Sequence, residues 1–196
     1  MQPKSKLENL DDLLAQAEHY AEHSMRSDIG RLPPTLFLIG SEGPLMFMPE
    51  SLADESEKDD FATTARLMCI AHAATSVVMA LEAWVKYAKP GERFDETEAP
   101  SEAFDRREFV ILMGESQSDG QKQRFLPIIR SDNGNFFGFG ESEVPDMDET
   151  NGRFARLLPT KMPDEGIRQV AKAMLKVKGA GRAMPGATPR LPRSRC

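Results

Sequence analysis

The chain has few of the residues that could cross-link it covalently or anchor it in a membrane. Its 196 residues include two cysteines, Cys69 and Cys196, and two cysteines do not make a disulfide framework. No apolar run approaches the ~18 residues of a membrane helix, and the N-terminal residues lack the apolar core of a signal peptide. These absences predict a soluble protein of a reducing, cytoplasmic compartment.

Basic charge is also scarce outside the C-terminal end. Residues 167–196 carry eight Lys and Arg and no acid, which leaves 17 basic against 31 acidic residues in the rest of the chain. An acidic surface does not suit contacts to phosphates, so we expect the body not to bind nucleic acid. The basic end could still contact nucleic acid or another acidic surface, including its own body.

The motifs that would fix a cofactor or a reaction are missing as well. The glycines of residues 134–140 have no following Lys and no strand-to-helix order, so they do not form a phosphate loop. Their alternation with Phe predicts a strand that buries one face. We expect no cofactor, and the sequence identifies no nucleophile or metal set.

Strand patterns dominate what is present, above all between residues 74 and 141. In residues 75–87 the odd positions, such as Val77 and Met79, form one apolar face. The even positions begin apolar and end polar at Glu82 and Trp84, as in a central strand that reaches the rim of its sheet. The competing interpretation continues the preceding helix, because Ala, Leu, Met and Glu favour helices.

The remaining elements follow from apolar spacing and turn residues. Strands are expected at residues 35–39, 45–48, 107–117, 122–130 and 136–140, and helices at 7–25, 61–74 and 165–178. Asp164 caps the last helix. Pro127 cannot donate to a ladder, so its strand should be at an edge or bulged there. Residues 49–60 are expected to form a charged loop.

Together these elements predict an α+β fold. We expect an antiparallel sheet of about five to seven strands, with one central packing helix and the two terminal helices at its margins. The predicted division is an N-terminal helix at residues 1–30, an α+β domain at 31–178 and a disordered basic tail at 179–196.

Two histidines four residues apart lie on the predicted N-terminal helix. His19, Glu22 and His23 match H-x-x-E-H, in which two His on one helical face hold zinc and the Glu serves as base. A catalytic zinc needs a third protein ligand, for which Glu98 or Glu102 could serve. The alternative is the solvated face of a surface helix, since the flanking sequence resembles no metallopeptidase.

A second pair, Cys69 and His72, is three residues apart on a helix. Such a pair could ligate a metal or form a reactive thiol with its base. The neighbours are apolar, and burial raises the pKa of a thiol, which makes it inert. We therefore expect a buried cysteine beside a hydrogen-bonded histidine.

A third group of polar residues surrounds the long acidic loop at residues 89–106. Glu82 and Trp84 share a strand face, and pairing of the strands that flank the loop would bring its ends near that face. The predicted cleft is lined by Glu82, Trp84, Ser101, Glu102, Asp105, Arg106, Arg107 and Glu115. Carboxylates there could do acid–base work. The alternative is structural: an arginine clamps a carboxylate and pins the loop over Trp84.

The same residues carry a resemblance. The pattern is E-A-W on a strand, then P-S-E-x-x-D-R, then a strand ending near a Glu, which fall here at residues 82–84, 100–106 and 115. In this pattern the chain resembles a set of uncharacterised bacterial and phage-borne proteins over about a third of its length. No activity is assigned to that set, so the resemblance implies a shared site and no reaction.

These observations favour a small non-enzymatic interaction or accessory protein, from a mobile element, that binds a protein partner. The first alternative is a hydrolase-like enzyme that uses Glu82, Glu102 and Arg106 in the predicted cleft. The second is a zinc protein that uses His19 and His23.

Overall fold

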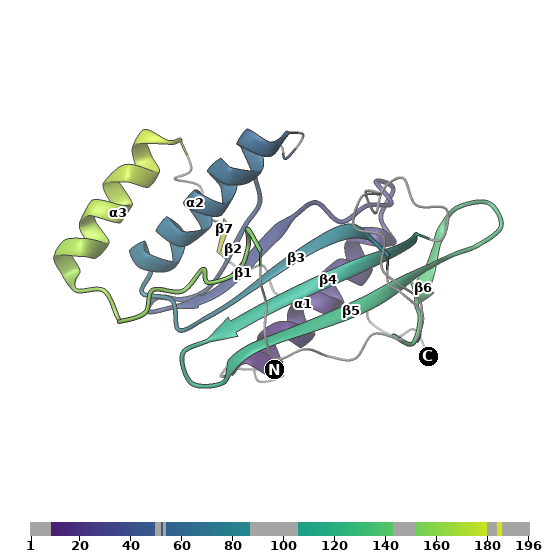
Figure 1. Cartoon of the computed structure of the whole chain (residues 1–196), viewed down its shortest axis with the longest axis horizontal. Helices are drawn as coiled ribbons and strands as arrows, with labels where there is room; N and C mark the ends of the chain where they lie inside the picture. The colour runs from purple at the N-terminus through teal and green to yellow at the C-terminus, as the bar shows by residue number, and fades with distance from the viewer. Residues whose placement is uncertain are drawn as a thin grey trace, which may run out of the picture.

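One antiparallel sheet organises the protein (Figure 1). The computed structural model describes residues 9–49, 52, 54–86, 106–142, 152–179 and 184–185. The strands are β1 (Thr35–Gly40), β2 (Gly43–Phe47), β3 (Ser76–Val85), β4 (Arg107–Ser116), β5 (Gly120–Arg130), β6 (Phe136–Phe139) and β7 (Met184–Pro185). The helices are α1 (Leu10–Met25), α2 (Glu55–Ala71) and α3 (Glu165–Val177). The strand order is β6-β5-β4-β3-β1-β2-β7. The predicted α+β class is confirmed.

The central strand β3 separates two hydrophobic cores. Val77 and Met79 point to one face, where they pack with α2 and α3. Val78 and Ala80 point to the other face, where they pack under α1. Both faces of this strand are therefore covered over its first half, which is why its sequence is apolar at successive positions. The predicted strand is confirmed over the competing helix by its pairing with β1 and β4.

Helix α1 lies across a face of the sheet and does not lie at its margin. Its buried side chains include Leu10, Leu14 and Met25, which share a core with β1, β3 and β4. The prediction of a marginal position was wrong, because the apolar side of the helix completes the second core. In Figure 1 α1 passes on the opposite side of the long strands from α2 and α3.

Helix α2 begins six residues before the predicted start. The side chain of Asp54 accepts a hydrogen bond of 2.8 Å from the backbone N–H of Glu57, which caps the helix. Glu55 and Glu57 lie in its first turn, where acidic side chains are favoured by the helix dipole. Residues 55–60 are therefore helical, and the predicted charged loop is shorter than expected. Asp164 caps α3 as predicted.

The prediction that the strand of Pro127 lies at an edge or is bulged at that residue was wrong, because β5 lies between β4 and β6 and the irregularity falls two residues later. Pro127 pairs with Phe109 at the end of the β4–β5 ladder, and a bulge follows between Ile129 and Arg130. Met184 and Pro185, inside the range predicted as a disordered tail, pair as β7 with β2. Among the described residues, no helix is long and apolar enough to span a membrane.

Candidate functional site

Two residues of the predicted cleft come together directly. The guanidinium carbon of Arg106 lies 4.5 Å from the centroid of the Trp84 ring, and Trp84 is 41% exposed. This is a cation–π contact at a half-covered aromatic surface. Ser101, Glu102 and Asp105 lie outside the described residues. The predicted pairing of Glu82 with Glu102 in a hydrolase-like site therefore falls outside the described structure.

Glu82 is engaged in holding the chain that enters β1. Its Oε1 accepts a hydrogen bond from the backbone N–H of Leu32. Burial raises the pKa of the Glu82 carboxyl, and the hydrogen bond from Leu32 and the charge of Arg130 oppose that rise. The contact favours the structural interpretation of Glu82, with a backbone amide as the partner in place of the predicted arginine.

A neighbouring ion pair completes this end of the sheet. Glu108 is the cross-strand partner of Trp84, and its Oε2 lies 2.6 Å from Nε of Arg130 on β5. Sequence reasoning missed both residues, because their proximity depends on the register of three strands. Arg107 pairs with Val85 and so lies on the opposite face of β4 from Glu108. The two arginines predicted to share the cleft therefore lie on different faces.

Glu115 is separated from the rest of the predicted cleft. It pairs with Val77 and lies on the α2 side of the sheet, five positions along β4 from the partner of Glu82. Its Oε2 accepts a hydrogen bond of 2.8 Å from the backbone N–H of Leu157. The hollow beside it has room for about one water molecule. Glu115 thus fastens the segment before α3 to the sheet.

Cys69 and His72 lie in different surroundings. Cys69 is fully buried, and burial raises the pKa of its thiol, with the charge of Glu115 adding to the rise. The prediction of a buried cysteine is confirmed. Nδ1 of His72 is buried without a hydrogen-bond partner among the described residues, so the predicted hydrogen-bonded histidine was wrong at that atom. Burial lowers the pKa of His72.

The H-x-x-E-H residues lie on the outer side of α1. His19 and His23 are exposed, and Oε1 of Glu22 lies 2.8 Å from Nη2 of Arg26. Within the part of the chain that the structure describes, no three His, Cys, Asp or Glu side chains group as metal ligands. The proposed third ligands, Glu98 and Glu102, lie outside that part.

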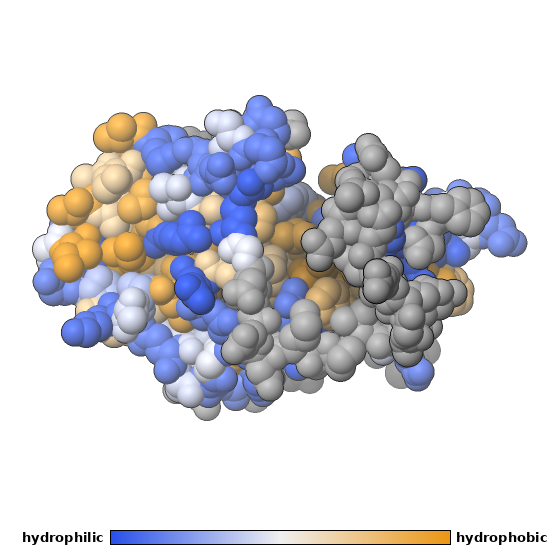
Figure 2. Space-filling view, viewed as in Figure 1, coloured by the Kyte–Doolittle hydropathy of each residue, from blue (hydrophilic) through white to orange (hydrophobic). Residues whose placement is uncertain are grey.

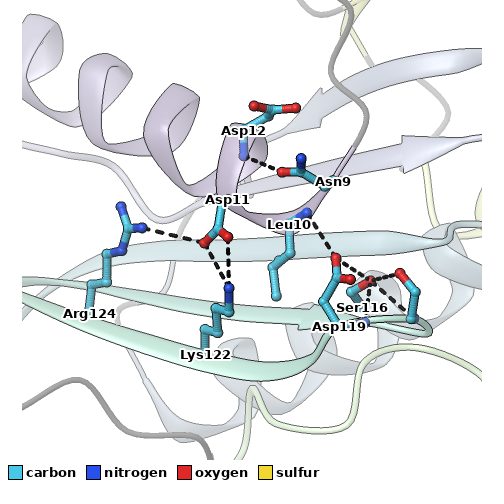
Figure 3. Close-up of polar contacts among 9 residues, drawn as sticks. Asn9, Leu10, Asp11, Asp12, Ser116, Asp119, Lys122 and Arg124 are labelled. Atoms are coloured by element: carbon cyan, nitrogen blue, oxygen red, sulfur yellow. Dashed lines mark hydrogen bonds and ion pairs between the residues drawn. The ribbon is translucent and has the colours of Figure 1, made fainter.

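The start of α1 rests on the turn between β4 and β5 (Figure 3). Oδ2 of Asp119 accepts a hydrogen bond of 3.3 Å from the backbone N–H of Leu10. The carboxylate of Asp11 lies 2.8 Å from Nζ of Lys122, and this partner lowers the pKa of Asp11. Ser116 donates to Asp119 at 3.4 Å. The polar groups satisfy one another, which indicates a docking contact within the fold.

Helix α3 exposes several large apolar side chains to solvent. Its outer side carries four apolar side chains at intervals of three, four and three residues. We call them the α3 stripe: Ile167 (52% exposed), Val170 (61%), Met174 (48%) and Val177 (89%). The helix packs on α2 through Ala171 and Leu175, which are buried. Only one edge of the apolar side of α3 is therefore buried against the rest of the protein. Figure 2 shows that hydrophobic residues gather at this end of the molecule.

Two cations of α3, Arg168 and Lys172, and Lys178 at its C-cap contact polar groups of the same chain. Nη1 of Arg168 lies 3.0 Å from Glu165, and Nη2 donates to Oγ of Ser41. Lys172 lies 3.8 Å from Glu42, and Lys178 contacts Asp60. These three cations are therefore paired with acids of their own chain, whereas Lys176 is exposed and the α3 stripe lies on another side of the helix.

The spacing of the α3 stripe can be seen in the sequence, but the exposure of its side chains cannot be predicted from it. The apolar periodicity of residues 167–177 predicts a helix with a buried side. Which part of that side α2 covers depends on the angle at which the two helices meet, which the periodicity does not specify.

Comparisons with protein-family models, with curated proteins and with solved structures find no match for this chain. The structure therefore defines the protein by its class alone: an α+β protein with helices on both faces of an antiparallel sheet. The resemblance at E-A-W and P-S-E-x-x-D-R stays a prediction.

Proposed function

We propose that this protein is a non-enzymatic interaction module that binds a protein partner through the α3 stripe. The observation that carries the proposal is the exposure of all four stripe residues on one helix. A contiguous apolar surface is costly to leave in water and is typical of a contact site. Apolar side chains at such spacing on a helix are also how helical recognition surfaces present their anchors.

The polar groups elsewhere support a binding role over catalysis. Glu82 and Glu115 each accept a hydrogen bond from a backbone N–H. Asp119 is committed to the start of α1. These carboxylates fasten loops and helices, and a structural use of this kind accounts for their positions without a reaction.

Capture of a partner by tagged chain, followed by purification of that partner, tests the proposal. The double variant Val170→Glu, Met174→Glu should bind the purified partner at least about ten-fold more weakly, because each Glu places a charge in the apolar contact. Both positions are exposed, so the free energy of unfolding should change by no more than about 0.5 kcal/mol per site.

Ile29→Glu is the matched control. Ile29 is 75% exposed and follows the end of α1, away from the stripe. Binding that survives in this control and is lost in the stripe variant supports the proposal. Equal binding by the stripe variant and the wild-type chain would overturn it.

A further inference from the structure

The histidine at the end of α2 lies where three parts of the fold meet. His72 is the C-cap of α2, and its carbonyl oxygen accepts a hydrogen bond of 2.9 Å from the backbone N–H of Ser41, between β1 and β2. Helix α3 packs beside α2 (Figure 1) and brings Arg168 and Lys172 near the imidazole. We propose that this junction is a pH-sensitive switch, at which protonation of His72 releases α3 from α2. The proposal concerns how α3 is held and does not depend on what binds the α3 stripe.

The main chain of His72 is fixed against the end of β1. A Cβ at Gly40 would lie 2.8 Å from the carbonyl oxygen of His72, so the two chain segments are in close contact there. The backbone N–H of His72 also donates to the carbonyl oxygen of Met68 at 3.1 Å. The main chain therefore does not carry the imidazole away from the junction, and a change in its charge acts on the elements beside it.

Two buried nitrogen atoms at this junction lack a hydrogen-bond partner in the described ranges of the chain. They are Nδ1 of His72 and Nε of Arg168. The other guanidinium nitrogens are used, since Nη1 lies 3.0 Å from Glu165 and Nη2 donates to Oγ of Ser41. A neutral imidazole has one acceptor nitrogen, which complements the N–H donor of Arg168. Protonation turns that acceptor into a second donor, and a buried donor without an acceptor costs free energy.

The charges that face His72 are carried by two different elements. Burial lowers the pKa of His72; Glu42, between β1 and β2, opposes that effect, and Lys172 and Arg168 of α3 add to it. When α3 leaves, both cations leave with it, together with Glu165, which is bound to Arg168. Glu42 stays, and it loses its contact of 3.8 Å with Lys172. The dipole of α2 favours a cation at its C-terminal end in either state. The imidazolium is therefore more stable once α3 is released.

The direction of the pH dependence follows from this difference. A lowered pKa of His72 in the docked state means that docking is strongest above pH 6.5 and weakens as the pH falls through the docked value. The contacts that remain are the packing of Ala171 and Leu175 in the core with α2 and the ion pair between Lys178 and Asp60. An element held by so few contacts opens locally at a lower free energy than the whole fold. Acid should therefore release α3 before the sheet unfolds.

Hydrogen exchange of the full chain, followed by mass spectrometry, tests the proposal. It compares about pH 8 with about pH 5, because histidine changes its charge in this range, and exposure times are scaled to the intrinsic exchange rate at each pH. At the lower pH, the protection of α3 relative to that of α1 should fall at least about three-fold. Unchanged protection of α3, or an equal loss in both helices, would overturn local release.

Three variants show whether His72 is the group that titrates. His72→Gln is uncharged at both pH values and should keep the protection of α3 constant between them. Arg168→Met removes the opposing cation and the unpaired donor, so the change with pH should be smaller than in the wild type. Lys178→Met is the matched control: it weakens docking through the contact with Asp60. It should lower the protection of α3 at both pH values and leave their ratio unchanged.

The ratio between the two pH values is the quantity compared, because it cancels any change in the strength of docking itself. A ratio in His72→Gln and Arg168→Met as large as in the wild type would overturn the role of His72. Loss of the pH dependence in Lys178→Met would assign it to the contact with Asp60 and would also overturn the proposal. Far-ultraviolet circular dichroism checks that each variant is folded, and Arg168→Met decides if His72→Gln is not.

Discussion

The backbone N–H of Leu32 donates a hydrogen bond to Oε1 of Glu82, fifty residues further along the chain. The contact ties the segment that enters β1 to the polar end of β3. The carboxylate is half-buried, and removing its charge from water costs free energy. The hydrogen bond offsets part of that cost and satisfies the backbone N–H of Leu32.

Two substitutions at Glu82 distinguish the effect of its hydrogen-bond acceptor on stability from the effect of its charge. Glu82→Gln keeps an oxygen for the Leu32 amide without the charge, so its free energy of unfolding at pH 7 should equal or exceed that of the wild type. Glu82→Ala leaves the amide without this acceptor and should lose about 1–3 kcal/mol. Urea denaturation measures both values. Equal stability of the two variants would contradict this account of the contact.

The burial of Glu82 also predicts that the stability of the protein depends on pH. Burial raises the pKa of Glu82 above its ordinary 4.5, so the folded state holds this proton more tightly than the unfolded state. The stabilisation is present below the ordinary value and is lost as the pH rises through the folded value. The advantage of Glu82→Gln over the wild type should therefore grow with pH above about 4.5 and then level off.

A second pH dependence is expected at His72. Burial lowers its pKa below 6.5, with Lys172 and Arg168 acting in the same direction and Glu42 against it. A lowered value means that the stabilisation is present above pH 6.5 and is lost as the pH falls through the folded value. His72→Gln should flatten the decline in unfolding free energy below pH 6.5. A decline as steep in His72→Gln as in the wild type would contradict this account.

Gly114 on β4 sets how closely α1 approaches the sheet. A Cβ at this position would lie 3.0 Å from Cδ1 of Leu10 and 3.3 Å from Cδ2 of Leu14. We expect Gly114→Ala to cost about 1–3 kcal/mol of unfolding free energy, because added volume in a packed core forces neighbours to shift.

Gly138 on β6 provides the matched control for that substitution. A Cβ there meets nothing within 4 Å, so Gly138→Ala should leave stability within about 0.5 kcal/mol of the wild type. Thermal or urea unfolding of both variants decides. An equal loss at the two positions would mean that the cost arises from the strand backbone and not from contact with α1.

The helices and strands of this fold can be predicted from the sequence more completely than the contacts between them. Period-two alternation located β3, and Asp164 marked the start of α3, because both signals are local. The early start of α2 was missed because its first two turns are acidic and mostly solvated, so apolar spacing begins only at Phe61. Local patterns thus predict an element where one of its sides is buried along its whole length.

Of the described residues of the predicted cleft, the structure brings two together and separates a third from them. Trp84 and Arg106 were predicted together, and they are in contact. Glu115 was assigned to the same cleft, but its register against Val77 places it on the opposite face from Glu82. A shift of one residue in register changes the face of a side chain, and sequence alone does not fix register to that precision.

The contact between Arg106 and Trp84 can be followed directly, because Trp84 is the only tryptophan in the chain. Arg106→Ala uncovers one side of the indole, so the fluorescence emission should shift to longer wavelength. The cation–π contact should contribute about 0.5–1 kcal/mol to stability, which Arg106→Lys retains in part. Arg107→Ala is the control, since Arg107 lies on the other face of β4 and should leave the emission unchanged. An equal shift in both variants would mean that the emission reports general loosening of this end of the sheet, and the contact of Arg106 with Trp84 would then not be what shields the ring.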